Sequence, residues 1–170
     1  VLTTGVNNIA IGPNSMVALT TGTDNVAIGR NAMGASTGSC CNIAIGFCAL
    51  GMCGAGSHDN TAIGQNAGCR LTGGICNIFI GRQAGATATT SCLMTAIGES
   101  AMGTGTATGK FGVLIGPGAG MKMTSSLATI GIGQSAQAQL TSGAYNIGIG
   151  RGAQSGVDGT FVTGQGSVAV

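Results

Sequence analysis

The side chains of this chain that could do chemistry are few and scattered. Its 170 residues include four carboxylates, one histidine and seven cysteines. The carboxylates are Asp24, Asp59, Glu99 and Asp158. General acid–base catalysis needs titratable groups within hydrogen-bond reach of the same substrate. Because the repeat described below separates Asp24 from Glu99 by four repeat units, we do not expect these carboxylates to act as a pair.

The segment Ser57-His58-Asp59 has the composition of a nucleophile, base and acid triad. Consecutive residues of an extended turn do not aim at one point, and no oxyanion-stabilising group accompanies them. We therefore expect no enzymatic activity, no catalytic residue and no cofactor. A metal site built from Cys48, Cys53 and His58 is an alternative, but no Cys-x-x-Cys pair supports it and none is predicted.

Composition excludes further classes of function. Charged residues make up 6% of the chain, and the net charge is only +2. The basic residues are scattered singly, so the chain lacks the lysine and arginine cluster that a nucleic-acid interface requires. Apolar residues reach 44%, but Gly, Thr and Asn interrupt every apolar stretch, which argues against membrane insertion.

A short motif recurs along the whole chain. Asn42-Ile43-Ala44-Ile45-Gly46 is repeated almost unchanged at residues 8–12, 25–29, 60–64 and 77–81. Looser copies follow, and the final glycine of each copy serves as a marker. The markers are Gly12, Gly29, Gly46, Gly64, Gly81, Gly98, Gly116, Gly133, Gly150 and a degenerate Gly164. Their spacing follows a 17-17-18 pattern, which divides the single domain 1–170 into blocks 1–52, 53–104 and 105–156 plus a tail 157–170.

Each repeat unit, called a coil from here on, predicts one short β-strand and a return path. Alternation in segments such as Ile9-Ala10-Ile11 indicates a strand, and the frequent glycines exclude helices of useful length. Stacked coils can share one core and pair their strands in parallel. The predicted fold is therefore all-β, a parallel β-solenoid (β-roll) of about ten coils.

The two isoleucine positions of each strand are expected to face the core. The central strand position would then point outward, where its small apolar residues suit contact with another chain. We predict this column as an association face: Ala10, Ala27, Ala44, Ala62, Phe79, Ala96, Leu114, Gly131 and Gly148. The asparagines that precede the strands predict a stacked amide ladder: Asn8, Asn25, Asn42, Asn60, Asn77 and Asn146.

The cysteines cluster in the third to sixth coils. They are Cys40, Cys41, Cys48, Cys53, Cys69, Cys76 and Cys92. Their offsets from the markers predict disulfides Cys53–Cys69 and Cys76–Cys92 between adjacent coils, because stacked strands lie about 4.8 Å apart. Such staples indicate an oxidising, extracellular location. An odd count leaves one thiol free or bridged to another chain, and free cysteines packed as small hydrophobes remain an alternative.

A column of threonines offers a second binding hypothesis. It comprises Thr20, Thr37, Thr72, Thr89, Thr106, Thr124 and Thr141. Threonines repeated on a flat β-face are typical of ice-binding solenoids, and the low charge agrees with that reading. The alternative is that these hydroxyls cap local turns.

The motif Asn-x-Ala-Ile-Gly-x-x-Ala followed by a Thr-Gly turn resembles the repeats of viral and phage tail-fibre proteins. It is also similar to the head domains of trimeric autotransporter adhesins. That resemblance implies a β-roll that associates as a homotrimer, with a cell-surface receptor as a further partner. We therefore expect a non-enzymatic structural or adhesive fibre module on a virion or cell surface. The alternatives are an ice-binding protein and a filament subunit that stacks end to end through uncapped coils.

Overall fold

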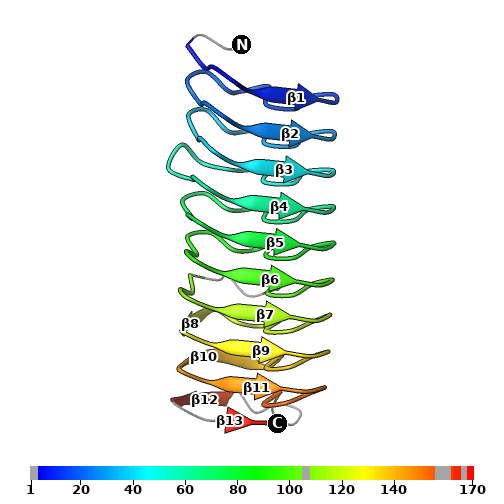
Figure 1. Ribbon diagram of the computed structural model, residues 1–170, viewed down its shortest axis with the longest axis vertical. Helices are drawn as coiled ribbons and strands as arrows, with labels where there is room; N and C mark the ends of the chain where they lie inside the picture. The colour runs from blue at the N-terminus through cyan, green and yellow to red at the C-terminus, as the bar shows by residue number, and fades with distance from the viewer. Residues whose placement is uncertain (1–3, 105–107, 156–161, 166–167) are drawn as a thin grey trace.

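The computed structural model describes residues 4–104, 108–155 and 168–170, together with the backbone of residues 162–165. It confirms the predicted fold class: an all-β parallel solenoid of about nine turns with a repeat of about 17 residues. Figure 1 shows the coils stacked into a straight rod, with one short strand of each coil aligned along the same side.

Ten strands form the main parallel sheet, in the order β1-β2-β3-β4-β5-β6-β7-β9-β11-β13. Equivalent motif positions pair directly, for example Ala27 with Ala44 and Ile28 with Ile45. The bounds of these strands are β1 (Ile9–Ile11), β2 (Val26–Ile28), β3 (Ile43–Ile45), β4 (Thr61–Ile63), β5 (Ile78–Ile80), β6 (Thr95–Ile97), β7 (Val113–Ile115), β9 (Ile130–Ile132), β11 (Ile147–Ile149) and β13 (Val168–Ala169).

A second sheet forms on another side of the last coils. It contains β8 (Ser125–Leu127), β10 (Leu140–Ala144) and β12 (Val162–Gln165) in the order β12-β10-β8. Gly164 belongs to β12 and pairs with Gly143, so it does not mark a tenth copy of the main strand. That place is taken by β13, which pairs with β11.

The marker glycines stack directly on one another along the rod. Gly29 has a φ of +128°, and a Cβ built there would lie 2.6 Å from the carbonyl oxygen of Gly46. Only glycine tolerates both this backbone conformation and this approach. The glycine after each strand is therefore required by the stacking itself.

The predicted orientation of the strands is wrong. The central position faces the interior: Ala27, Ala44 and Phe79 have no exposed surface, whereas Ile43 and Ile78 remain 40% and 41% exposed. A three-residue strand directs either its central side chain or its two flanking ones to one face. The space between the strand and the return path of its own coil takes the single central side chain, even where that is Phe79, and the flanking isoleucines point outward. The predicted association face is thus buried, apart from Ala10 in the first strand.

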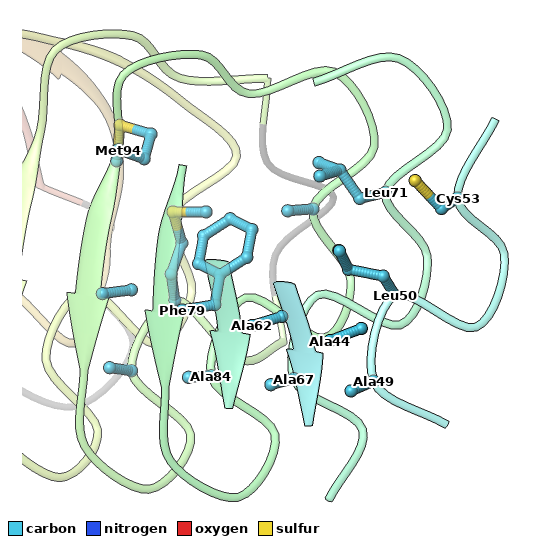
Figure 2. Packing of buried hydrophobic residues seen from close by; sticks show 14 of the residues in the cluster. Ala44, Ala49, Leu50, Cys53, Ala62, Ala67, Leu71, Phe79, Ala84 and Met94 are labelled. Carbon is cyan, nitrogen blue, oxygen red and sulfur yellow. The ribbon is translucent and has the colours of Figure 1, made fainter. Parts of the chain in front are cut away.

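Large and small residues compensate one another inside the coils (Figure 2). Ala44 shares its coil with the buried Leu50, six residues later. Phe79 instead has Gly85 at the position equivalent to Leu50, and a Cβ on Gly85 would lie 2.6 Å from the Phe79 ring. Leu114 and Gly120 repeat this exchange, with a corresponding separation of 2.7 Å. Most coils therefore hold a bulky side chain at one of these two positions. The fourth coil has Ala62 and Gly68 instead, and the space beside Gly68 is filled by Leu50 and Phe79 of the adjacent coils.

This exchange predicts the outcome of a double-mutant cycle. Phe79→Ala should lower the free energy of unfolding by about 3–5 kcal/mol, because it leaves a cavity. Adding Gly85→Leu recreates the Ala44 and Leu50 arrangement and should restore about half of that loss. Leu50 itself adopts a φ of 46° at the equivalent position, so the backbone accommodates leucine there. Urea unfolding of the three variants tests this.

Gly85→Leu alone should be destabilising, since its side chain would collide with Phe79. Additive effects of the two substitutions would contradict the compensation.

Candidate functional site

An exposed apolar face on the main sheet is the candidate binding surface. We define this apolar face as the first and third positions of the aligned strands. The first column contains Ile9, Val26, Ile43, Thr61, Ile78, Thr95, Val113, Ile130 and Ile147. The third column contains Ile11, Ile28, Ile45, Ile63, Ile80, Ile97, Ile115, Ile132 and Ile149. All of these residues are partly or largely exposed.

The exposed columns carry no charged residue. Exposure is highest at the first coil, 56% for Ile11, and stays at 37% for Ile115 and Ile132 farther along the rod. Charges lie instead at the two borders of the face. Asp24 and Asp59 precede their strands, whereas Arg30 and Arg82 follow theirs. The border before the strands is therefore mainly acidic, with the exposed Lys110 as an exception, and the border after them is mainly basic, with Glu99 as an exception.

Polar contacts between side chains also lie at the two borders of the apolar face. Nδ2 of Asn7 donates to Oδ1 of Asp24 at 2.9 Å. Arg82 forms an exposed salt bridge with Glu99 of the next coil. Such surface pairs contribute little to stability. Exposed Leu93 and Phe111 occupy positions equivalent to that of Asp24, so the border contains both polar and apolar side chains.

The predicted asparagine ladder is present from Asn8 to Asn77. The Asn42 side chain is representative: its Nδ2 donates to Oδ1 of Asn25 at 3.2 Å. Its own Oδ1 accepts from Nδ2 and from the backbone N–H of Asn60, both at 3.0 Å. Met94 occupies the next rung, and its sulfur accepts from the N–H of Gly112 at 3.1 Å. Asn146 is buried farther along the rod, beyond this interruption.

The ladder is buried and its amides hydrogen-bond to one another, so its role is structural. We expect Asn42→Met to lower the free energy of unfolding by about 1–3 kcal/mol more than Asn77→Met does. Oδ1 of Asn77 accepts only one hydrogen bond, from the backbone N–H of Met94 at 3.1 Å. A thioether sulfur at residue 77 could accept that bond, just as the sulfur of Met94 accepts from the N–H of Gly112. At Asn42 a thioether could accept from only one of the two Asn60 nitrogens that Oδ1 of Asn42 serves. Either the backbone N–H of Asn60 or the Nδ2 hydrogen that does not donate to Gly74 would then be buried without a partner. Comparing the two unfolding free energies in urea checks this; equal losses would contradict it.

The threonine column lies mostly in bends outside the main sheet. Hydroxyls of Thr20 and Thr124 donate to the carbonyl oxygens of Thr37 and Thr141, at 2.9 and 2.8 Å. Thr72 donates likewise to Thr89, at 3.3 Å. These contacts join adjacent coils, so they assign the hydroxyls to the stacking of the coils and differ from the local turn caps of the alternative interpretation. Thr106 lies outside the described residues, and the ice-binding surface stays a prediction.

The predicted cysteine pairs do not meet. Cys53 is 1% exposed and packs in the core, whereas Sγ of Cys69 lies 3.1 Å from Sγ of Cys48. Cys92 is in register with Ile75 and not with Cys76. All seven cysteines are free thiols in the structure. The prediction treated Cys53 and Cys69 as equivalent, although they lie at different distances from their marker glycines. The side chain at the position of Cys53 faces inward, and the one at the position of Cys69 does not.

The thiols differ in their environments. Burial raises the pKa of the Cys53 thiol. Burial, reinforced by the hydrogen bond with Cys48, raises the pKa of Cys69 to about 12. The exposed Cys41 also has a raised pKa, chiefly because its side chain hydrogen-bonds to Cys40. None of these three environments favours a reactive thiolate.

The Ser57-His58-Asp59 segment does not form a triad. Oγ of Ser57 is buried without a hydrogen-bond partner, and Nδ1 of His58 contacts Sγ of Cys40 at 3.0 Å. Asp59 is exposed at the border of the apolar face. Among the described residues, no three His, Cys, Asp or Glu side chains are grouped closely enough to hold a metal ion. Asp158 lies outside the described residues.

The described part of the chain contains no helix that could cross a membrane. No protein-family model matches the sequence. Comparisons with curated proteins and with solved structures likewise find no similar protein. The site must therefore be interpreted from its own geometry.

One signal in the sequence pointed to the apolar face. Thr61 and Thr95 occur in the first strand column, whereas the central column contains only Ala, Gly, Phe and Leu. A hydroxyl at a fully buried position would need a partner inside the coil. The recurrence of threonine in the first column therefore indicated that this column faces outward, and that the third column, on the same side of the strand, does so too.

Proposed function

We propose that this chain is a non-enzymatic structural module, a rod-like segment of an extracellular or virion fibre. Three copies associate side by side through the apolar face. The observation that carries the proposal is the unbroken run of exposed Ile, Val and Thr side chains along the main sheet. Monomeric proteins rarely expose a contiguous apolar patch larger than a few hundred Å².

The dimensions of the face suit lateral association. Strand stacking at about 4.8 Å per coil gives a sheet roughly 45 Å long, and side chains that project from short, flat strands form a regular surface. Burying such a surface against a second copy supplies a hydrophobic gain of about 25 cal/mol per Å². Because the side chains are already fixed by the stacked coils, little conformational entropy is lost when the copies meet.

The charged borders favour parallel copies. In a parallel assembly, the acidic border of one rod, with Asp24 and Asp59, lies beside the basic border of its neighbour, with Arg30 and Arg82. Antiparallel face-to-face packing would instead bring like borders together. A parallel ring of three rods satisfies this complementarity at every contact and closes on itself.

The resemblance of the Asn-x-Ala-Ile-Gly repeat to tail-fibre and adhesin repeats supports the same class of function. A fibre segment needs length, regular self-association and no catalytic groups, and each of these agrees with the sequence. The association surface is the apolar face, which replaces the central strand column expected from the sequence. A receptor-binding role would belong to other surfaces of the same fibre.

The proposal predicts the mass in solution. Light scattering should give about three times the chain mass of 16.3 kDa. The double variant Ile43→Lys/Ile78→Lys should be monomeric, because two ammonium groups per copy would be buried in an apolar interface. Met52→Lys is the matched control: Met52 is 51% exposed but lies on the return path of its coil, away from the apolar face and its borders, so this variant should keep the assembled mass.

A wild-type monomer would refute the trimer and redirect attention to an ice-affinity assay. Open-ended polymers that persist in the double variant would instead indicate end-to-end stacking.

A further inference from the structure

Two thiols on adjacent coils are poised to react with each other. Cys48 follows Gly46 by two residues, and Cys69 follows the next marker, Gly64, by five. Their sulfur atoms are 3.1 Å apart. The backbone fixes this juxtaposition, because the N–H of Met52 donates to the carbonyl of Cys69 at 2.8 Å across the same two coils. Both side chains are half-buried.

Gly51 makes room for the sulfur pair. It occupies the place in its coil that Cys69 occupies in the next, and a Cβ there would lie 2.5 Å from Sγ of Cys48 and 3.5 Å from Sγ of Cys69. The thiol of Cys48 also lines an open surface groove. The groove is formed with Asn14, Val17, Asn31, Gly34 and Met52, so a small reagent can reach Cys48 from solvent.

We propose that Cys48 and Cys69 are an oxidation site that closes to an inter-coil disulfide in the presence of a small-molecule disulfide such as glutathione disulfide. The two sulfurs need to approach by about 1 Å to reach the length of a disulfide bond. Side-chain rotation supplies this movement without shifting the stacked backbone. The resulting bond staples the third coil to the fourth.

The reaction proceeds by two exchanges. The thiolate of Cys48 attacks glutathione disulfide, forms a mixed disulfide and releases one glutathione thiolate. The thiolate of Cys69 then attacks the Cys48 sulfur, forms the protein disulfide and releases the second glutathione. Two protein thiols are oxidised and one glutathione disulfide is reduced to two thiols; the two thiol protons pass to solvent or to the released thiolates.

The order of attack follows from the surroundings of the two thiols. Cys48 is reached from the groove, whereas burial is the main reason that the pKa of Cys69 is raised. Closure therefore accelerates as pH rises, since more of Cys69 becomes thiolate. Cys53, the alternative partner in the sequence-based prediction, is enclosed in the core and cannot reach the pair.

The test is oxidation of the folded chain with glutathione disulfide at pH 8. Remaining thiols are then blocked with N-ethylmaleimide in denaturant, and the intact mass is measured. The wild type should lose two thiols at Cys48 and Cys69 with no glutathione on either, as located by peptide mapping, which separates them from glutathione taken up by the exposed Cys41 and Cys76. Cys69→Ser should retain one glutathione, attached to Cys48, because the second exchange has no attacking thiol. Cys53→Ser is the matched control and should still lose two thiols.

Circular dichroism establishes that each variant is folded before oxidation. The proposal is overturned if the folded wild type retains all its thiols, or if Cys48→Ser still loses two. The second outcome would indicate a different pair, such as Cys40 with Cys41. It is also overturned if Cys53→Ser abolishes closure. None of these outcomes depends on the number of copies that associate, so the result is independent of the fibre proposal.

Discussion

The narrow interior of each coil is the constraint on which the rest of the structure depends. One short strand and its return path lie so close together that the strand can direct only one side chain inward. Where that side chain is Ala44, a second buried position holds Leu50; where it is Phe79, the second position is Gly85. The branched residues on either side of the strand centre have no space inside, and they form the outer surface instead.

This constraint produces both the stability of the rod and the exposed apolar face through which we propose that it associates. The interior is filled by small and bulky side chains that compensate one another, and the buried asparagine ladder lies at one of its corners. Neighbouring coils share this core, so no single coil depends on a core of its own. The excluded isoleucines then recur at every coil on a flat sheet. A surface generated in this way is as regular as the stacking, which suits a partner with the same repeat, namely another copy of the chain. The same stacking places Cys48 and Cys69 side by side.

Much of the fold could be predicted because it is encoded by periodicity. The marker glycines and the asparagines identified the coil length, the strands and the amide ladder from Asn8 to Asn77. Periodicity alone could not decide which strand face is buried, since alternation in Ile9-Ala10-Ile11 is compatible with either. Hydrophobicity favoured burying isoleucine, but the available volume favours alanine, and volume prevails in so thin a coil. The cysteine pairs failed for a related reason, because the position of Cys53 faces the core.

The orientation and burial of the isoleucines are tested most directly by methyl NMR with a soluble paramagnetic agent. Isoleucine methyl relaxation would be compared between the wild type and the Ile43→Lys/Ile78→Lys variant. The methyl group of Ile80 should relax slowly in the assembled wild type and rapidly in the variant, where the apolar face is open to solvent. Slow relaxation in both would contradict the outward orientation of the isoleucines, and rapid relaxation in both would contradict the proposal that the face is an interface.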